Sequence, residues 1–545
     1  MPITRRRFLR RTAAATAATA TPLASLFSAK MAEAQESAFG PLLDDPRRIL
    51  NLPEGFSYVV IQRQGDVMSD GVSVPGLPDG MAAFSGGEAD PAGSIILMRN
   101  HEVRPDGDRS DAFFGREPTT EQAAMMPDPG AFGGVSRVVL DGGTFLPTAS
   151  NTVLAGTYSN CAGGPSPWGW ITCEESTDIL STAAGTGASA ATDWHGYCYV
   201  TRTDATGQAM PERLDAYGRF NHEAVAIDTA TNTAYLTEDR TDGYFYRFVP
   251  NDPAEPFGAG RFQALGRLNE EIFDTTTMLA GDVIQVAWRD IDNPTPNVSD
   301  GSGAGAEPTA RQQAFAAGAA TVVRGEGCWM DDARGVVYFT ATFGGELRLG
   351  QIFRYVPTDR NDPDAGGLLE CIARPEDRDV MFNPDNIAVA PWGEIFFVED
   401  SFERCRLLVL NPSTGVISPL AQNPNRSAEL AGVCFAPGRS DVVFMNLQRE
   451  GITVAITGPF DTTEVDPNLP DPPAPTEDMG TGADMGGADM GAADMSVDAG
   501  APADDEGGGC STSDAAIGLA QAGVAAAAVA AVASKTRKPA DEDAQ

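Results

Sequence analysis

The stretch FNHEAVAIDTATNTAYLTEDR, Phe220 to Arg240, contains a pattern that recurs along the chain and predicts its architecture. It begins with a polar entry, continues with a short apolar strand and a turn, and ends with a second apolar strand and a polar cluster. Short apolar runs bounded by turn signals are typical of β-strands. The stretch therefore predicts two neighbouring strands with polar side chains gathered at one end.

Five other stretches repeat this pattern along the chain. They are DGMAAFSGGEADPAGSIILMRNHE from Asp79, NCAGGPSPWGWITCEES from Asn160, GEGCWMDDARGVVYFTATF from Gly325, NPDNIAVAPWGEIFFVEDS from Asn383 and LAGVCFAPGRSDVVFMNLQ from Leu430. Most copies are followed by a further apolar strand, such as GYFYRFVP or GQIFRYVP. The repeat predicts an all-β fold, a six-bladed β-propeller that forms a single large domain over residues 35–460. A β-sandwich is the alternative, but it does not explain why entries and strand ends match in six copies.

The N-terminal residues 1–34 have the features of an export signal. TRRRFLR from Thr4 precedes a weakly apolar stretch, and Ala32 to Ala34 forms a small-x-small cleavage pattern. This combination predicts export by the twin-arginine pathway, which carries folded proteins, to the periplasm or the cell surface. An ordinary secretion signal fits less well, because Phe8 and Leu9 follow the arginines as in twin-arginine signals.

The C-terminal part has a composition that does not predict a fold. Residues 461–509 are rich in Pro, Asp, Gly, Ala and Met, which predicts a disordered acidic stalk. Residues 510–545 contain Cys510, an Ala-rich run and the basic stretch KTRK. This segment resembles the cysteine-containing sorting tails of myxobacterial surface proteins, and a retained Ala-rich transmembrane helix is the alternative. Both interpretations predict contact with the membrane only through this tail.

The net charge of the chain is -38. A charge of this size and sign argues against nucleic acid and anionic membrane surfaces as partners. It is consistent with a protein that collects cations.

Polar residues recur at the strand entries and at the strand ends of the repeats. In a propeller the innermost strands line a central channel, so these positions are expected to converge. Buried carboxylates repel each other unless cations neutralise them, so the pattern predicts a metal site. Oxygen ligands favour Ca2+, and a thiolate with carboxylates favours a transition metal such as iron. The entries carry Cys161, Asn221 to Glu223, Glu326, Asp385 and Asn386; the strand ends carry Asn100 to Glu102, Glu174, Glu175, Glu238, Asp239, Glu399 and Asp400.

Cys161 has two interpretations. It is either a metal ligand or the disulfide partner of Cys173, and we favour the ligand, with Cys173 as a core residue, because the other cysteines are scattered singly on apolar strands. His101 and His222 each lie in an N-H-E triplet, where they are either ligands or hydrogen-bonding partners of ligands.

Arg324 stands two residues before Glu326. On a strand these side chains share a face, which predicts an anion clamp beside the metal-binding carboxylate. A surface arginine paired with an acid is the alternative. The sequence has no GxSxG, P-loop or HExxH motif, which argues against a serine hydrolase, a nucleotide-dependent motor and a zincin.

Several of these motifs resemble the PhoX-type alkaline phosphatases. They are NCAGG with PWGWITCEE, GRFNHEA, YLTEDR, RGEGCWMDD with VYFT, and FNPDNIAV with VED, and the resemblance covers Pro41 to Phe460. It implies an exported six-bladed propeller with a mixed cluster of Fe3+ and Ca2+. The implied activity is hydrolysis of small phosphate monoesters by a cluster-bound oxo or hydroxo group, and we expect a monomer.

The resemblance also implies roles for individual residues. Cys161 bridges two irons, Glu223 and Glu326 ligate the cluster, and Asp385 is a further ligand. Arg324 is the phosphate clamp and, with Glu326, is assigned to catalysis. Glu174, Glu238 and Asp239 are additional metal ligands by the same resemblance. The chain departs from the family in having no recognisable lysine-type phosphate contact in NTVLAGTYSN before Cys161.

Two other functions fit the same fold. One is a calcium-dependent lactonase or a phosphodi- or phosphotriesterase propeller, which needs no thiolate. The other is a non-catalytic surface propeller that binds metal or another ligand. Cys161 discriminates between these hypotheses, because only the cluster enzyme depends on its sulfur.

Overall fold

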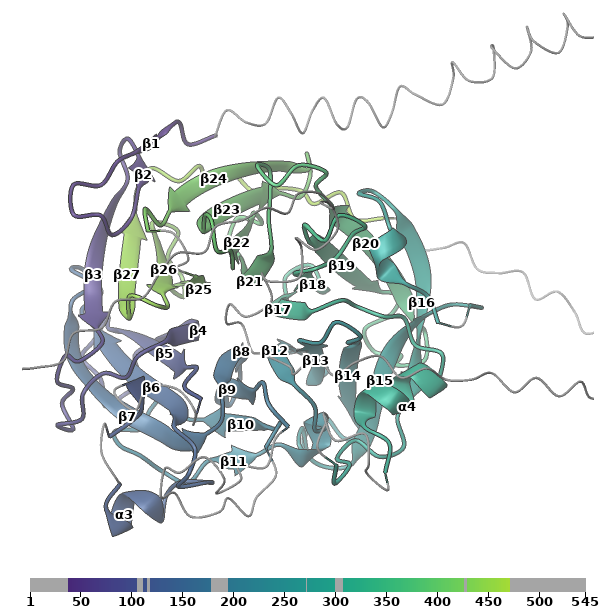
Figure 1. Cartoon of the computed structure of the whole chain (residues 1–545), viewed down its shortest axis with the longest axis horizontal. Coiled ribbons are helices and arrows are strands. Elements are labelled where there is room, and N and C mark those ends of the chain that lie inside the picture. Colours follow the sequence, from purple (N-terminus) through teal and green to yellow (C-terminus); the bar gives the residue numbers. More distant parts are fainter. Residues whose placement is uncertain are drawn as a thin grey trace, which may run out of the picture.

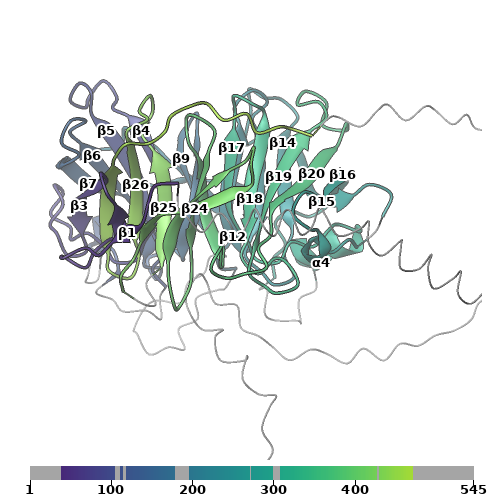
Figure 2. The same cartoon turned by 90° about the horizontal axis from the view of Figure 1, so that it is seen from above.

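The computed structural model of the chain describes residues 38–104, 111–114, 118–177, 195–270, 272–298, 307–425 and 429–470. Antiparallel sheets surround a central axis (Figure 1), and the side view shows them side by side in a flattened body (Figure 2). The prediction of an all-β, propeller-like fold is confirmed. The predicted signal at 1–34, the stalk beyond residue 470 and the tail at 510–545 lie outside the described residues.

Three sheets consist of four strands that are consecutive in the chain, each paired antiparallel with the next. The first contains β4 (Pro78–Ser85), β5 (Ile95–His101), β6 (Gly133–Leu140) and β7 (Pro147–Thr157). The second contains β8 (Asn160–Ser166), β9 (Gly169–Glu174), β10 (Cys198–Thr201) and β11 (Glu212–Arg213). The third contains β21 (Pro384–Val389), β22 (Ile395–Glu399), β23 (Arg406–Asn411) and β24 (Val416–Gln422).

A fourth sheet joins the two ends of the described chain. It consists of β25 (Leu430–Phe435), β26 (Val442–Leu447), β27 (Ile452–Thr457) and β3 (Ser57–Arg63). The outer strand β3 pairs antiparallel with β27, with Ile452 opposite Arg63. The N-terminal strand therefore completes a sheet that the C-terminal strands begin, and this closes the circle of sheets.

The remaining large sheet has nine strands, which differs from the separate repeats that the sequence predicts. It contains one four-stranded run, β12 (His222–Asp228), β13 (Thr233–Glu238), β14 (Phe245–Pro250) and β15 (Gly260–Arg267). It also contains β17 (Gly325–Asp331), β18 (Val336–Ala341), β19 (Gln351–Pro357) and β20 (Gly367–Ala373). Strand β16 (Val283–Asp290) pairs with both β15 and β20. The two runs are continuous because β16 bridges their outer edges.

The first strand of each run lies next to the axis. These six strands, β4, β8, β12, β17, β21 and β25, form a closed ring in which each contacts the next and β25 contacts β4 (Figure 1). Their entry ends therefore face a common centre, as the sequence pattern predicts.

Shorter elements complete the described fold. They are β1 (Leu42–Leu43), β2 (Leu52–Pro53), the helices α3 (Thr120–Ala123) and α4 (Ala310–Ala316), and 3-10 turns at Asp215–Tyr217 and Thr275–Thr277. Among the described residues no helix has the length and apolar character needed to span a bilayer.

The first residues after the last strand lie against the sheets. The backbone N–H of Val465 donates a hydrogen bond of 2.8 Å to the carbonyl of Trp392. The Nη1 group of Arg354 donates to the carbonyl of Pro467 over 2.8 Å. The described beginning of the predicted stalk, residues 461–470, is thus held by the domain.

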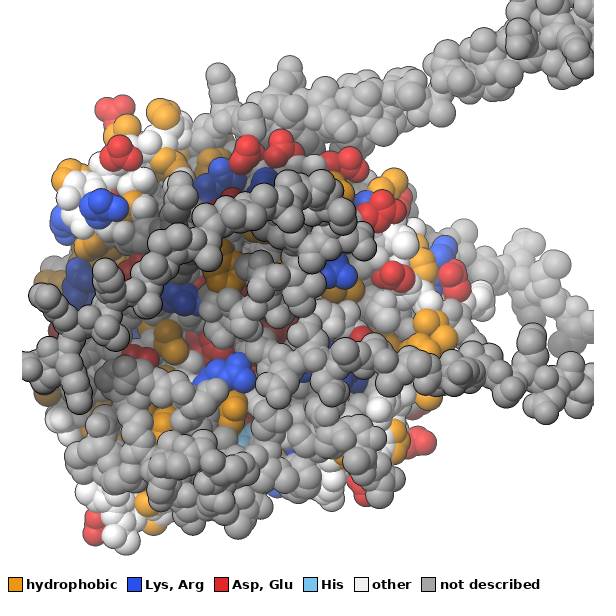
Figure 3. Space-filling model, viewed as in Figure 1, with side chains coloured by type: hydrophobic (Ala, Val, Ile, Leu, Met, Phe, Trp, Pro, Cys, Tyr) orange, Lys and Arg blue, Asp and Glu red, His pale blue; other side chains and the backbone are white. Residues whose placement is uncertain are grey.

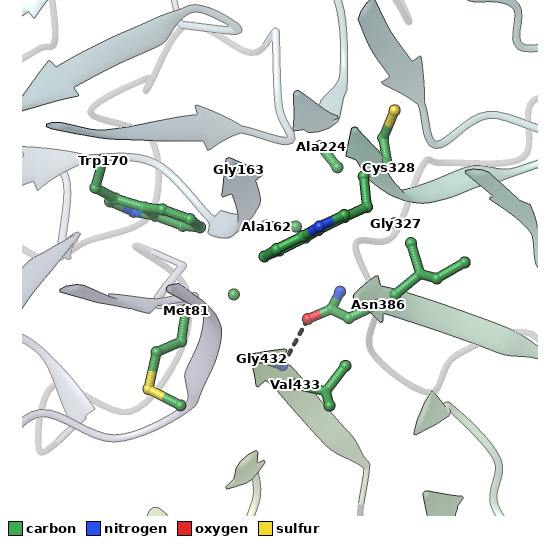
Figure 4. Close-up of a pocket in the computed structure, with 13 residues that line it drawn as sticks. Met81, Ala162, Gly163, Trp170, Ala224, Gly327, Cys328, Asn386, Gly432 and Val433 are labelled. Carbon is green, nitrogen blue, oxygen red and sulfur yellow. Dashed lines mark hydrogen bonds between the residues drawn. The ribbon is translucent and has the colours of Figure 1, made fainter. Parts of the chain in front are cut away.

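Close packing at the axis depends on small residues in the inner strands. Figure 4 shows Ala162, Gly163, Ala224 and Gly327 around a narrow pocket that Trp329 also lines. A Cβ atom on the neighbouring Gly164 would lie 1.8 Å from the carbonyl oxygen of Val225 on the adjacent strand β12. The glycine is therefore required for two inner strands to approach each other.

We expect Gly164→Ala to lower the free energy of unfolding by about 2 kcal/mol or more. The added methyl group would clash with a backbone carbonyl, which cannot move away without distorting the strand. Gly207→Ala is the matched control, since a Cβ atom there meets no atom within 4 Å. Its effect should stay within about 0.5 kcal/mol. Denaturant unfolding of both variants measures the difference, and equal midpoints would contradict the predicted packing.

Candidate metal centre

A β-bulge lies near the entry of each of the six inner strands. Each inner strand loses register with its neighbour for two residues, as between Pro78 and Met81 or between His222 and Val225. A bulge inserts unpaired residues and re-aims their side chains. The first residue inside each shift is Asp79, Cys161, Glu223, Glu326, Asp385 or, in β25, Gly432.

The same backbone hydrogen bond closes every bulge. The residue just beyond the second strand donates its N–H to a carbonyl just before the inner-strand bulge, over distances of 2.8 to 3.2 Å. This contact brings a second set of side chains beside the first. The six donor–acceptor pairs are Glu102 and Leu77, Glu175 and Ser159, Asp239 and Asn221, Thr342 and Arg324, Asp400 and Asn383, and Gln448 and Glu429.

Polar side chains from neighbouring sheets hold the bulges in place. The amide Nδ2 of Asn100 donates to the carbonyls of Cys161 and Ala162, at 3.1 and 2.7 Å. In the same way Asn446 donates to the carbonyl of Asp79 at 2.6 Å, and Thr340 donates to that of Asp385 at 2.8 Å. The backbone that carries the central side chains is therefore fixed by hydrogen bonds across sheet boundaries.

Two groups of possible metal ligands result from this arrangement. One joins Cys161, Glu175 and Glu223, and the other joins Glu223, Glu326 and Asp385. Within each group the ligand atoms lie within 4.8 Å of one another, and all the residues are buried. Glu223 belongs to both groups, so the two form one continuous centre, which we call the acidic ring. In the space-filling view down the axis, acidic and basic side chains appear near the middle of the face turned to the reader (Figure 3).

The electrostatics of the acidic ring favour bound cations. Burial, with repulsion from neighbouring carboxylates, raises the pKa values of Glu175, Glu223 and Asp385 well above their ordinary range. The pKa of Glu102 is raised to about 7 and that of Asp400 to about 6, again mainly by burial. Protons or cations must therefore compensate the charge.

Unsatisfied oxygens provide a test of whether cations fit. Among the described residues, buried Asp79 Oδ1, Glu102 Oε1, Glu175 Oε2 and both carboxylate oxygens of Glu429 accept no hydrogen bond. A buried polar atom without a partner is costly, and carboxylate oxygens are the preferred ligands of hard cations. The donor set therefore fits metal binding.

Arg324 lies at the rim of the acidic ring. Its Nε and Nη2 groups donate to the two carboxylate oxygens of Asp239, at 2.7 and 2.9 Å. Its Nη2 group also lies 2.9 Å from Oε1 of Glu326. Although burial opposes ionisation, the guanidinium lowers the pKa of Asp239 below its ordinary value.

The expected approach of Arg324 to Glu326 is observed, but its backbone cause differs from the one predicted. Arg324 precedes β17 and has a positive φ of 52°, so strand alternation does not set its direction. Asp239, expected as a metal ligand, uses both oxygens to hold this arginine.

The second strand of three four-stranded runs ends with a pair of acids, and the two acids of each pair have different roles. The first acid of each pair points away from the ring and binds a loop amide and a cationic side chain. Glu174 accepts from Tyr158 N and His195, Glu238 from Tyr244 N and Arg311, and Glu399 from Phe382 N and Arg406. The second acid, Glu175, Asp239 or Asp400, lies at the ring.

This division changes the ligand set expected from sequence. The structure does not bring Glu174 or Glu238 into either ligand group, whereas it brings in Glu175. Successive side chains on a strand point to opposite faces, so only one acid of a pair can reach the centre. The alternation of side chains along a strand indicates that one acid of each pair faces the axis. The sequence does not show whether it is the first acid or the second.

The family of the chain follows from comparison with known proteins. The family model for the alkaline phosphatase PhoX matches residues 37–151 and 145–451, which is more than half of the chain. The chain belongs to the PhoX alkaline phosphatase family. It is therefore a hydrolase of the phosphoesterase type. A search of curated proteins gave no match.

One solved structure supports the fold of this PhoX family member, and two others match with lower TM-scores. Pseudomonas fluorescens PhoX in complex with vanadate, a transition state analogue, is 18% identical, with a TM-score of 0.57 over 78% of this chain and 98% of that chain. Virginiamycin B lyase from Staphylococcus aureus is 10% identical, with a TM-score of 0.32 over 74% and 99%. A Trichoderma reesei carbohydrate-active enzyme of family AA12 is 11% identical, with a TM-score of 0.35 over 77% and 100%.

The cysteines and histidines occupy distinct environments in this PhoX family member. Cys161 is not bonded to Cys173; its Sγ lies 3.3 Å from the carbonyl of His222, and both cysteines are free. His101 is held between the carbonyl of Gly76 and the hydroxyl of Ser136, at 2.8 Å each. His101 thus makes hydrogen bonds inside the fold, whereas His222 lies in a further group of possible metal ligands.

His195 is a structural residue that the sequence did not single out. Burial disfavours its charged form, but Glu174 at 2.8 Å and Asp128 at 3.1 Å raise its pKa to about 10. The imidazolium therefore bridges the carboxylates of Glu174 and Asp128. Nothing in the stretch DWHGYCYV signals this role without the fold.

We expect the metal-free protein to become more stable as pH falls from about 8 to about 5. Carboxyls with raised folded pKa values bind more protons when folded than when unfolded, where pKa values are about 4. Their stabilising contribution is complete below about pH 4 and is lost as pH rises through the folded values, about 6 for Asp400 and about 7 for Glu102. Melting temperatures of chelator-treated protein measure this trend, and a rise with pH across that window would contradict it.

We expect Glu174→Gln and Glu175→Gln to have opposite consequences. Glu174→Gln should destabilise the fold by about 3–5 kcal/mol, because it breaks a buried ion pair with His195. Glu175→Gln should leave metal-free stability equal or higher, because it removes repulsion, but it should reduce metal content. Unfolding and metal analysis of both variants, with exposed Glu212→Gln as control, test the division. Loss of metal from Glu174→Gln alone would reverse the assignment.

Proposed function

We propose that this chain is an exported, metal-dependent phosphomonoesterase. The observation that carries the proposal is the convergence of Cys161, Glu175, Glu223, Glu326 and Asp385 in one buried centre of a PhoX family chain. A lactonase-type calcium site has no use for the buried thiol at this place. A non-catalytic binding propeller has no use for the guanidinium held at its rim.

The donor chemistry suggests which residues hold which cation. Cys161, Glu175 and Glu223 combine a thiolate with carboxylates, a set that suits Fe3+. Glu223, Glu326 and Asp385 offer only carboxylate oxygens, which suit Ca2+. When bound, these cations supply positive charge that polarises a phosphoryl group and lowers the pKa of water.

Arg324 is the residue we assign to phosphate binding. Its planar donors match the oxygens of a phosphate group, and Asp239 fixes their orientation through two hydrogen bonds. The ring of Phe343 lies 4.8 Å from its Cζ and limits its movement from another side. A bound phosphate would share this guanidinium with Asp239 and Glu326, so little reorganisation is needed.

We further propose that the fold is a six-bladed propeller in which the nine-stranded sheet contains two of the blades. The two four-stranded runs of the nine-stranded sheet each begin with an inner strand, β12 or β17. Both inner strands have the same bulge and the same closing amide hydrogen bond as the others. On this view β16 is an added strand that links the outer edges of two blades.

The cellular setting is part of the same proposal and rests on sequence. Residues 1–34 direct export by the twin-arginine pathway, and residues 510–545 attach the protein to the envelope. The substrate is a small phosphate ester, and the enzyme acts as a monomer without a nucleic acid partner. The net charge of -38 is consistent with this choice of partners.

Hydrolysis of p-nitrophenyl phosphate at mildly alkaline pH tests the proposal, with metal-loaded and chelator-treated protein compared. We expect turnover that the chelator abolishes and that Ca2+ together with iron restores. Cys161→Ser should lower kcat at least about 100-fold and remove visible colour, since metal charge contributes several kcal/mol. Cys371→Ser is the matched control, because that buried thiol belongs to neither ligand group of the acidic ring and makes hydrogen bonds with Gln351 and Ala373.

Two results would favour an alternative function, and a third would test the phosphate contact. Full activity of Cys161→Ser with Ca2+ alone would favour the calcium-dependent lactonase or phosphotriesterase. Absence of turnover on mono- and diesters by protein that contains both iron and calcium would favour the non-catalytic propeller. Loss of activity in Arg324→Lys with unchanged metal content would support the assigned phosphate contact.

A further inference from the structure

A second group of possible ligands lies behind the acidic ring. Cys173 on β9, Cys198 on β10 and His222 on β12 place two sulfurs and one ring nitrogen within 4.8 Å of one another. The two Sγ atoms are 3.5 Å apart, and Sγ of Cys198 is 3.3 Å from Nδ1 of His222. All three side chains are fully buried, among apolar neighbours such as Ile171 and Leu236. We call this group the thiol cluster.

Strand register brings the two cysteines together. Cys173 and Cys198 are directly opposite in the antiparallel pair β9–β10. The next pair along is hydrogen-bonded, since the N–H of Glu174 donates to the carbonyl of Tyr197 over 3.0 Å. The cysteines therefore occupy a non-hydrogen-bonded pair, in which side chains are closest. Their proximity is built into the sheet.

The hydrogen bonds of His222 fix which of its nitrogens is available. Nε2 lies 3.1 Å from the carbonyl oxygen of Gly218, which only accepts hydrogen bonds, so Nε2 carries the proton. Nδ1 then directs its lone pair at Cys198. The imidazole also stacks on Phe220, with ring centroids 3.6 Å apart. A histidine held through its second nitrogen by a carbonyl is typical of a metal ligand.

We propose that Cys173, Cys198 and His222 bind a divalent thiophilic cation of the Zn2+ type. Two cysteines and one histidine form a ligand set that zinc takes in proteins. Binding replaces the two thiol protons, which leave to solvent, and two thiolates with a divalent cation are neutral overall. An uncharged complex is what an apolar core tolerates.

A disulfide between the two cysteines explains less of the geometry. Oxidation would consume both thiol hydrogens and leave Nδ1 of His222 without the donor that Cys198 supplies. Leaving a buried acceptor without a partner is unfavourable. A cation, by contrast, uses all three converging atoms, which is why the geometry favours it.

The thiol cluster would position the acidic ring. His222 directly precedes Glu223, and its carbonyl lies 3.3 Å from Sγ of Cys161. A cation there would tie the β8–β11 sheet to β12 at this point. It would thus fix the backbone that carries two members of the acidic ring, without contact with substrate. The inference does not depend on the proposed phosphatase activity.

Metal analysis of the purified full-length protein tests the inference. We expect Cys173→Ala and Cys198→Ala each to lose one equivalent of zinc-type metal per chain, with Cys161 unchanged in both variants. Cys434→Ala, which removes a fully buried thiol outside the thiol cluster, should keep that equivalent. X-ray absorption of zinc in Cys161→Ser protein should show two sulfur ligands and one imidazole nitrogen, and it needs neither alanine variant to fold.

Two outcomes would overturn the inference. One is equal zinc-type metal content in Cys198→Ala, Cys434→Ala and unmodified protein, or a zinc shell without sulfur. The other is a Cys173–Cys198 disulfide found by mass spectrometry of protein purified with its metals. Because these readouts do not use phosphate esters, an inactive protein that contains iron, calcium and the sulfur-bound metal would refute the proposed function and leave this inference standing.

Discussion

The bulge near the entry of each inner strand is the constraint on which the centre depends. A regular strand would alternate its side chains and send acids to both faces. The bulge turns one residue per strand toward the axis, and a backbone amide from the second strand closes it. Asn100, Thr340 and Asn446 then brace the bulges from neighbouring sheets. Without these contacts the carboxylates would not meet.

The concentration of negative charge at the axis requires support from the rest of the fold. Buried carboxylates that repel one another destabilise the metal-free protein, so the surrounding sheets must offset that cost. Glu174, Glu238 and Glu399 contribute to this support through buried ion pairs and loop amides. In the pair Glu174 and Glu175, one acid therefore acts as scaffold and the next as a possible ligand for cations.

Rigidity around the acidic ring is consistent with the proposed chemistry. Catalytic geometry is held best when supporting side chains are themselves fixed by packing and hydrogen bonds. Asp239 fixes the orientation of Arg324 by hydrogen bonds. A cation in the proposed thiol cluster would likewise fix the backbone near Cys161 and Glu223. The sheets that hold the centre also close into a circle, because β3 pairs with β27 and β25 contacts β4.

The amino-acid sequence alone was enough to predict the local elements, the repeat and the types of side chain that gather at the centre. Paired apolar runs predicted the strands, and the recurrence of acids with Cys161 predicted converging ligands. Only the tertiary structure decided that Glu175 rather than Glu174 reaches the ring and that Asp239 holds Arg324. It also decided that Cys198 meets Cys173 and that β16 merges two runs into one sheet. The reason is that strand phase depends on bulges and on pairing between distant segments, and neither leaves a periodic signal in the chain.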